Sequence, residues 1–501
     1  MLRNIGSNWV LTIVTIAATY FLTPFVIHTL GTEGYGTWTL ITSMTGYMSL
    51  LALGVPMACV RYIAHDIAAG DPNQVRKTVG SCAGLYLLMG AAALAIGIGL
   101  AVVFTMYDIP AGLRPDAVAA FALMAVQVSA GFIGLLPEGI MFAHHDFVVR
   151  NAVRVAGVVL RLALTVTALM LNASLTLLAV VQLACLGFDF GVSFLLVRRR
   201  YPHIRISLAD FDWTVVRRIF SFSAYVLLLS AGARLTFETD ALVIGAVLGV
   251  GSIPFFAVAN SLVIYLMEFV IAIAAVVSPM ATKLGAEGKL DDLREIFLKW
   301  SKVALSLSML AGLFLMVLGP KFIGWWIDPS FEEPSGQVLQ ILMVSCFFFL
   351  PVRGVALPVL MGLGKPKAPT FAFVASGFAN LALSVFLARD YGLAGVALGT
   401  AIPNILFSLF VLMIACRELD VSVSRYVQYV VPRAALGAFP VVALLLWFKL
   451  SVQVQTLADL ALAGSAVVAL FALTWIFFVY RDDPYVDLRG HVVRLRQWSR
   501  A

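Results

Sequence analysis

Charged side chains lie inside long apolar stretches of this sequence, and three arginines among them form a regular pattern. Arg150, Arg154 and Arg161 are spaced by four and seven residues. On a helix, at about 100° per residue, they would fall within roughly 40° of one another on one face. A guanidinium group binds phosphate oxygens through planar, bidentate hydrogen bonds. The pattern therefore predicts a helix whose arginine face binds phosphate oxygens.

A structural interpretation of the same arginines stays open. Arg150 and Arg154 would then extend to the membrane interface, and Arg161 would pair with an acid such as Glu138 or Asp189. The two interpretations differ in whether the positive charges face a cavity or are neutralised inside the protein.

A second set of charges follows further along the chain. Arg234 and Glu238 are four residues apart, a spacing that suits an intrahelical ion pair. Asp240 has no obvious partner of this kind, and Glu268 lies in the next apolar stretch. Ionisable groups within a membrane are costly and usually functional. Asp240 and Glu268 are therefore a candidate site for a coupling proton or sodium ion, and coupling to the membrane potential is the alternative.

Two isolated arginines complete the candidate binding residues. Arg353 is flanked by Pro351 and Pro358, which predicts an irregular helix, and broken helices often line substrate sites in transporters. Arg61 lies at the inner end of an apolar stretch, where it either binds a head group or anchors the interface. No spacing of histidine, cysteine or carboxylate residues predicts a metal site, and no residue is predicted to be catalytic.

The composition indicates which solvent surrounds these charges. The 501 residues are 61% hydrophobic and only 12% charged. A soluble protein of this length has no use for so much apolar surface, because a hydrophobic core stops growing well below this size. The sequence therefore predicts an all-α, multi-pass membrane protein.

A membrane-spanning helix needs about 20 predominantly apolar residues, and the sequence contains fourteen such stretches. They lie near residues 5–29, 37–62, 79–104, 117–142, 150–171, 174–197, 219–247, 252–282, 302–327, 336–362, 368–388, 392–416, 429–448 and 458–480. Ahead of the third stretch, Asp71-Pro72 predicts a helix cap followed by a first-turn proline.

The positive charges orient these spans. If the N-terminus is cytoplasmic, the inner segments hold 25 lysine and arginine residues, and the outer loops hold four. Both termini are therefore expected in the cytoplasm, with the chain in the bacterial inner membrane. The same distribution explains the net charge of +7 without nucleic acid as a partner.

The outer loops are short, and neither a Gly-Lys-Ser/Thr phosphate loop nor a soluble catalytic domain is present, so we expect no enzyme activity and no cofactor.

An internal repeat relates the two halves of the chain. The stretch from Leu30-Gly31 through Gly70 returns from Leu248-Gly249 through Gly288, at an offset of 218 residues. A repeat of this length contains six spans, so both copies would have the same orientation and enclose a cavity between them. We expect a six-helix lobe at 1–200, a second at 201–418, two additional helices at 419–482 and a basic cytoplasmic tail at 483–501.

The first 80 residues carry family-like motifs. They are Leu30-Gly31-Thr32-Glu33-Gly34-Tyr35-Gly36-Thr37-Trp38, Ala52-Leu53-Gly54-Val55, Arg61-Tyr62-Ile63-Ala64 and Gly70-Asp71. With these motifs and its 14-span plan, the chain resembles the polysaccharide-biosynthesis (Wzx-type) oligosaccharide flippases of the multidrug/oligosaccharidyl-lipid/polysaccharide exporter superfamily. The resemblance implies a V-shaped pair of six-helix lobes that opens alternately to either face of the membrane.

The resemblance also implies the cargo and the partners. The cargo would be an undecaprenyl-pyrophosphate-linked oligosaccharide, delivered to the outer leaflet for O-antigen, capsule or exopolysaccharide assembly. The partners would be membrane lipids and the polymerase and export machinery of the polysaccharide. A cation-coupled multidrug antiporter of the same superfamily is the alternative. Such a protein would line its cavity with acids and aromatic side chains, which the arginine stripe disfavours.

Overall fold

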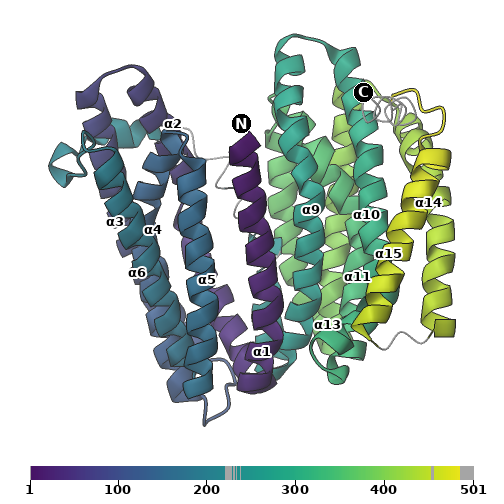
Figure 1. The fold of residues 1–501 in the computed structure, drawn as a ribbon, viewed down its shortest axis with the longest axis horizontal. Helices are drawn as coiled ribbons and strands as arrows, with labels where there is room; N and C mark the ends of the chain where they lie inside the picture. The colour runs from purple at the N-terminus through teal and green to yellow at the C-terminus, as the bar shows by residue number, and fades with distance from the viewer. Residues whose placement is uncertain are drawn as a thin grey trace, which may run out of the picture. The chain divides into compact units, whose positions relative to one another are not determined.

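The structure, a computed structural model, describes residues 2–52, 54–219, 228, 232, 234–236, 238–452 and 456–485. Every regular element within these residues is helical, and none is a strand. Eleven of the described helices are long and apolar enough to cross a membrane (Figure 1). The chain is therefore an all-helical, multi-pass membrane protein. Most of the predicted basic tail at 483–501 lies outside the described residues.

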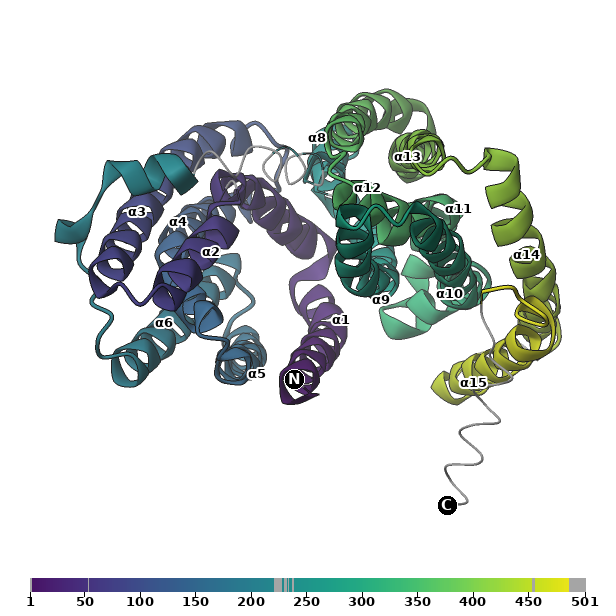
Figure 2. The same cartoon turned by 90° about the horizontal axis from the view of Figure 1, so that it is seen from above.

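The chain divides into two compact units, Met1–Pro254 and Phe255–Ala501. The α-helices described in the N-terminal unit include α1 (Leu2–Met48), α2 (Val55–Ala68), α3 (Pro72–Phe104), α4 (Arg114–Ala143), α5 (Phe147–Leu171), α6 (Leu175–Arg200) and α8 (Thr239–Val247). Short 3-10 segments are η1 (Ser49–Ala52), η2 (Leu208–Asp210) and η3 (Val250–Ser252). Within this unit α4 packs between α3 and α6, and α5 packs against both α1 and α6 (Figure 2).

The C-terminal unit begins within α9 (Ile253–Ala286). It continues with α10 (Leu290–Trp326), η4 (Pro329–Phe331), α11 (Glu332–Pro351), the π-helical η5 (Val352–Ala356), α12 (Leu357–Gly362), α13 (Lys367–Glu418), α14 (Val423–Trp447), the π-helical η6 (Phe448–Val452), α15 (Leu457–Thr474) and the π-helical η7 (Trp475–Val479). An apolar cluster that includes Leu318, Val441, Leu445 and Val467 packs α14 and α15 against α10.

Two of the long helices are each interrupted by a glycine. Gly31 within α1 has φ 72° and ψ 174°, and Gly392 within α13 has φ 57° and ψ −135°, so neither continues the helix. The stretch predicted as one span near 37–62 also differs from the prediction. Its α-helix stops at Met48, the 3-10 segment η1 follows, and α2 starts at Val55 directly after Gly54, which takes a left-handed conformation.

The N-terminal ends of helices are fixed by hydrogen bonds that short polar side chains supply. Asp71 caps α3 and accepts hydrogen bonds from the backbone N–H groups of Asn73 and Gln74, which confirms the predicted cap. Asp116, in the first turn of α4, accepts hydrogen bonds from Ser174 Oγ (2.8 Å) and from the Leu175 backbone N–H (2.6 Å). The start of α4 is therefore tied to the start of α6.

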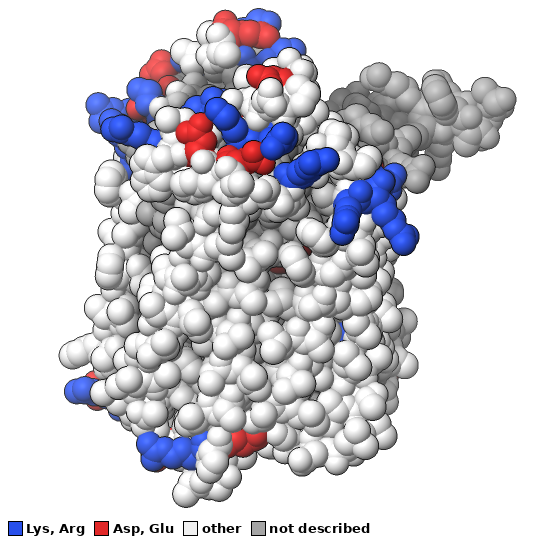
Figure 3. Space-filling view, turned by 90° about the vertical axis from the view of Figure 1, so that its left-hand side faces the viewer, with Lys and Arg blue, Asp and Glu red and all other residues white. Residues whose placement is uncertain are grey.

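The outside of the helices is apolar over their middle. On α3, Leu88, Ile98 and Val102 are 57%, 66% and 60% exposed, which suits a lipid environment and would be costly in water. Figure 3 shows one face of the molecule on which charged side chains gather at the two ends and uncharged residues fill the broad band between them. Near the start of α3, Arg76 pairs with Asp210 at 3.0 Å and Lys77 lies 3.7 Å from Asp212.

Candidate functional site

The candidate site is built on one face of α5. This helix begins at Phe147 after a turn in which His145 has a φ of 59°. Arg150, Arg154, Gly157 and Arg161 follow at helical spacing and share one face. Arg161 lies about 21 Å from the first residue of α5, at 1.5 Å per residue. The predicted arginine face is therefore part of a helix that is long enough to span the membrane.

Glu138 of α4 contacts the first two arginines. Its Oε2 accepts a hydrogen bond from Arg154 Nη2 at 2.6 Å and a longer one from Arg150 Nε at 3.4 Å. The Arg150 guanidinium also lies over the Phe142 ring, 5.4 Å from its centre. The sequence suggested Glu138 as a partner of Arg161, whereas in the structure it pairs with Arg150 and Arg154.

Asp189 of α6 lies against the arginine face of α5 at Gly157, between Arg154 and Arg161. A Cβ at Gly157 would lie 2.3 Å from Asp189 Oδ1, so the absence of a side chain at this position gives the carboxylate its space. Arg161 is close enough to Asp189 to act on it electrostatically. Arg161 Nε and Asp189 Oδ1 are buried and have no hydrogen-bond partner in the described structure.

The charges of this cluster do not cancel. Three arginines of α5 face two acids, Glu138 and Asp189, so the cluster keeps an excess of positive charge. The Arg154 side chain is 41% exposed and Glu138 is 24% exposed. Each guanidinium carries five N–H donors, of which the contacts with Glu138 use one apiece. The arrangement can therefore accept an additional anion with several oxygens, such as a phosphate.

The second set of predicted charges forms a separate group in the N-terminal unit. Arg234 Nη1 lies 2.6 Å from Glu238 Oε1, and Arg234 Nη2 donates to Ser49 Oγ at 3.1 Å. Asp240 lies in the first turn of α8 and is buried. Glu268 belongs to α9 in the C-terminal unit, where it is exposed. Glu238 is thus already engaged by a cation, while Asp240 and Glu268 lie in different units.

Arg353 lies in the C-terminal unit, within the π-helical segment Val352–Ala356 that follows Pro351. The irregular helix predicted at this position is confirmed. Its guanidinium stacks over the Phe373 ring, 5.0 Å from the centre. Among the described residues no carboxylate lies within 4.0 Å of its nitrogens. Arg353 is therefore a mostly enclosed positive charge that an aromatic ring supports on one side.

Arg61 lies on α2 and is exposed. The next residue, Tyr62, stacks against Arg218, whose Cζ is 4.4 Å from the ring centre. Asp66, one turn further along α2, is buried and accepts a hydrogen bond from Thr78 Oγ1 at 2.6 Å. Arg61 thus lies beside a small polar cluster that joins α2 to α3. No group of three metal-binding side chains is found in the residues that the structure describes.

A buried ion pair in the C-terminal unit was not predicted. Lys302 Nζ of α10 lies 2.5 Å from Asp483 Oδ2, and the two side chains are 1% and 0% exposed. Tyr429 of α14 donates a hydrogen bond to Asp483 at 2.8 Å, and Lys302 also lies over the Tyr429 and Tyr480 rings. In the sequence Lys302 lies at the start of an apolar stretch, where a lysine is commonly part of a loop. Its role in a buried ion pair becomes visible only through Asp483, which is distant in the sequence.

Sequence relatives of the chain are membrane proteins. Residues 1–284 match the family model described as "Polysaccharide biosynthesis protein". A protein of Shigella flexneri named "Putative O-antigen transporter" is 24% identical over 396 residues, which are 77% of this chain and 90% of that protein. The uncharacterized membrane protein EpsK of Bacillus subtilis (strain 168) is 21% identical over 424 residues, 80% of each chain.

Solved transporters share the fold. The lipid II flippase MurJ, in an inward closed conformation, has a TM-score of 0.72 at 12% identity, over 96% of this chain and 99% of MurJ. An inward-facing multidrug resistance MATE family transporter of the MOP superfamily has a TM-score of 0.67 at 14% identity, over 81% and 98% of the two chains. These likenesses concern the fold. The family model covers more than half of the sequence, and on that ground the chain belongs to the polysaccharide biosynthesis protein family.

Proposed function

We propose that this chain is a flippase that moves undecaprenyl-pyrophosphate-linked oligosaccharides from the cytoplasmic to the outer leaflet of the bacterial inner membrane. The observation that carries the proposal is the arginine face of α5, where three arginines outnumber the two acids that face them. The membership of the polysaccharide biosynthesis family and the similarity to an O-antigen transporter support the choice of cargo.

The position of the arginines favours an anionic cargo. Arg154 is 41% exposed within a helix long enough to span the membrane. A guanidinium in contact with lipid tails would be costly, so we infer that this face lines a water-filled cavity. A diphosphate there would offer oxygens to Arg150, Arg154 and Arg161 in turn. Arg353, and Arg61 at the inner end of α2, are the other arginines that we assign to the cargo's charged head.

Translocation is proposed to follow alternating access between two six-helix lobes, with two further helices and both termini in the cytoplasm. Fourteen spans are supported by the breaks at Gly31 and Gly392, each of which divides one long helix into two. Helical residues at 213–219 and in α8 support a further span that is only partly described. The excess of lysine and arginine in the inner segments supports the orientation.

We assign the coupling of transport to H⁺, Na⁺ or the membrane potential. Asp240, which is buried, and Glu268 are the acids that we assign to a coupling cation. Glu238 is paired with Arg234. The chain would act without covalent chemistry and would deliver its cargo to the polymerase and export machinery in the outer leaflet.

Neutralising two arginines of α5 tests the proposal. In cells that depend on the protein, Arg154→Gln with Arg161→Gln should make complete lipid-linked oligosaccharides accumulate on the cytoplasmic leaflet while the protein still inserts. The matched control is Arg198→Gln with Arg199→Gln, which removes two positive charges from exposed positions at the end of α6. The control should export normally.

Two results would contradict the proposal. Unchanged export in the double variant of α5 would show that the arginine face is not needed for transport. If depletion of the whole protein leaves the amount and sidedness of lipid-linked sugars unchanged, the protein is not their flippase. The cation-coupled multidrug antiporter would then be the function to test, by drug efflux.

A further inference from the structure

The contact of Glu138 with the arginine face is incomplete. A single oxygen, Oε2, accepts both hydrogen bonds, from Arg154 at 2.6 Å and from Arg150 at 3.4 Å. A carboxylate that binds arginine in its strongest geometry uses both oxygens in parallel. Glu138 is also 24% exposed, and its partner Arg154 is 41% exposed. The contact is thus partly exposed and uses one carboxylate oxygen, so an anion that offers more oxygens can replace the carboxylate.

The helix that carries Glu138 is weakened next to this contact. Pro137 lies inside α4, where it removes one backbone hydrogen bond and disfavours a straight helix. The first turn of the same helix is held by the hydrogen bonds of Asp116 to the start of α6. The end that carries Glu138 is held by apolar packing, since Ile140 and Met141 are fully buried.

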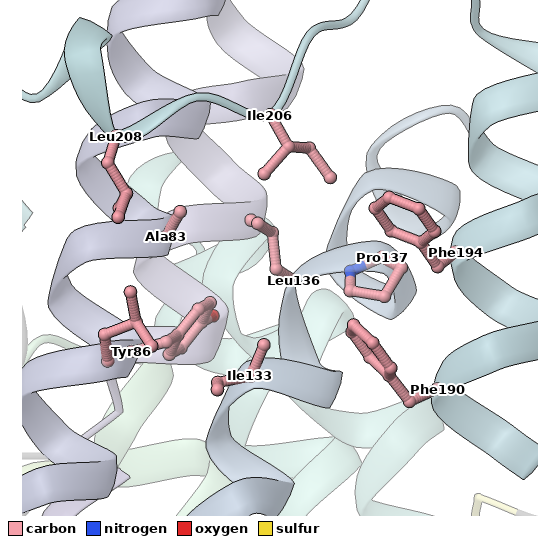
Figure 4. Close-up of a pocket in the computed structure, with 10 residues that line it drawn as sticks. Ala83, Tyr86, Ile133, Leu136, Pro137, Phe190, Phe194, Ile206 and Leu208 are labelled. Carbon is pink, nitrogen blue, oxygen red and sulfur yellow. The ribbon is translucent and has the colours of Figure 1, made fainter. Parts of the chain in front are cut away.

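A cavity lies beside α4 at the same level. Its volume is about 150 Å³, and its lining is almost entirely apolar. Figure 4 shows Leu136 and Pro137 of α4 at this cavity, between Tyr86 of α3 on one side and Phe190 and Phe194 of α6 on the other. Unfilled space beside a helix lowers the cost of moving it, because few packing contacts must be broken. The cavity loosens the packing beside Leu136 and Pro137, while Ile140 and Met141 further along are fully buried. The group with room to move is therefore the partly exposed side chain of Glu138.

We propose that Glu138 is a resident counter-anion, which occupies Arg150 and Arg154 in the empty transporter and is displaced from them by the diphosphate of the cargo. The inference rests on the proposed function, since it assigns a role in cargo selection to the same arginine face. Displacement needs an anion that binds the arginines better than one carboxylate oxygen does. A diphosphate meets this condition through its several oxygens and its higher charge, and a monoanion does not.

The consequence is a filter for the charge of the cargo. While Glu138 stays on the arginines, two acids face the three guanidinium groups, so the cluster attracts a weak anion less strongly than it would with Glu138 displaced. A diphosphate removes Glu138 and gains both guanidinium groups. The preference for diphosphate over monophosphate would therefore depend on Glu138, whereas the ability to bind any phosphate would depend on the arginines.

Binding measurements on the purified full-length protein test this inference, with inorganic pyrophosphate and inorganic phosphate as probes. Glu138→Gln should bind pyrophosphate about tenfold more tightly than the natural protein, since one charged hydrogen-bond competitor is gone. Its affinity for phosphate should rise more, so that the preference for pyrophosphate falls. Asp210→Asn, which removes the partner of Arg76 at the membrane surface, is the control and should leave both affinities unchanged.

Glu138→Asp is the second variant, for use where Glu138→Gln does not fold. Its shorter side chain keeps the charge but withdraws it from Arg154, and it should show a smaller gain in the same direction. Equal or weaker pyrophosphate binding in the folded variants would overturn the inference, as would no binding by any protein. If oligosaccharide export still requires Arg154 and Arg161 in that case, only the role of Glu138 fails and the flippase stands.

Discussion

Gly31 and Gly249, which are 218 residues apart, have nearly the same backbone conformation. Gly31 has φ 72° and ψ 174°, and Gly249 has φ 88° and ψ 156°. The other ends of the two repeated stretches agree as well, with φ 70° at Gly70 and φ 69° at Gly288. The repeat found in the sequence therefore starts and ends on glycines of matching conformation in both copies, although α9 is continuous where the first copy breaks between Met48 and Val55.

Alanine at Gly31 or at Gly249 should destabilise the protein by about 1–3 kcal/mol, because this combination of φ and ψ is accessible essentially to glycine alone. No heavy atom lies within 4 Å of the position that a Cβ would take at either residue, so the cost comes from the backbone and not from a clash. Thermal unfolding of the purified protein in detergent measures the effect.

Gly99→Ala is the matched control for these two variants. Gly99 of α3 also has open space at the Cβ position, but it is helical. Alanine is favoured over glycine in a helix by about 1 kcal/mol, so this variant should unfold at the same or a higher temperature. If Gly31→Ala and Gly99→Ala unfold alike, the break in α1 does not need glycine.

Gly157→Ala should damage the candidate site itself. The new Cβ would lie 2.3 Å from Asp189 Oδ1 and 3.1 Å from its Cγ, so the carboxylate must leave its place beside Arg161. We expect a loss of stability of about 1–3 kcal/mol, as for other overpacked positions, together with reduced flipping of lipid-linked oligosaccharide. Adding Asp189→Ala should restore stability by removing the clash.

The control for this substitution is Gly187→Ala, two residues before Asp189, where a Cβ meets nothing within 4 Å. It should leave stability and transport close to those of the natural protein. A Gly157→Ala protein that is as stable and as active as this control would show that Asp189 does not need its place against α5.

Patterns within one helix could be predicted from the sequence. The arginine face of α5, the ion pair between Arg234 and Glu238 and the cap at Asp71 each depend on residues no more than 11 positions apart. Helical geometry fixes such relationships before any helix packs. The irregular helix at Arg353 belongs to this group, because the flanking prolines act locally.

Contacts between helices could not be predicted in this way. From the sequence alone, Glu138 could pair with any of several arginines. The packing of α4 beside α5 determines that it pairs with Arg150 and Arg154. Similarly, the need for glycine at position 157 arises only because Asp189 of the neighbouring α6 lies against it. Lys302 and Asp483 are 181 residues apart, so no spacing could reveal them as a pair.

Arg353 should act through its charge and not through its stacking on Phe373. Arg353→Gln should strongly reduce transport of lipid-linked oligosaccharide, and Arg353→Lys should retain part of it, since lysine keeps the charge but not the planar fork. Phe373→Leu removes the ring that lies 5.0 Å from the guanidinium and keeps the charge. At matched protein levels it should transport better than Arg353→Gln. Equal losses in these two variants would assign Arg353 to packing.

The buried pair of Lys302 and Asp483 should stabilise the attachment of the last helices to α10. Removing one partner, as in Asp483→Asn or Lys302→Met, leaves the other charge buried and should cost about 3–5 kcal/mol. The double variant Lys302→Met with Asp483→Leu has no unpaired charge and should recover most of this loss. The thermal midpoint of unfolding in detergent measures all three, with Lys289→Met, an exposed surface lysine, as the control.

The pH dependence of this pair separates it from a neutral hydrogen bond. Burial alone would raise the pKa of Asp483, but hydrogen bonds from Lys302, the Tyr485 backbone N–H and Tyr429 outweigh it and hold the pKa below its ordinary value. A carboxyl whose pKa is lowered in the folded protein contributes stability above its unfolded pKa, and this stability is lost as the pH falls through the folded pKa. The difference in thermal midpoint between the natural protein and Asp483→Asn should therefore be the same at pH 7 and pH 5 and shrink only below about pH 4. A difference that already disappears at pH 5 would mean that Asp483 is protonated there and that Lys302 is not held by an ion pair.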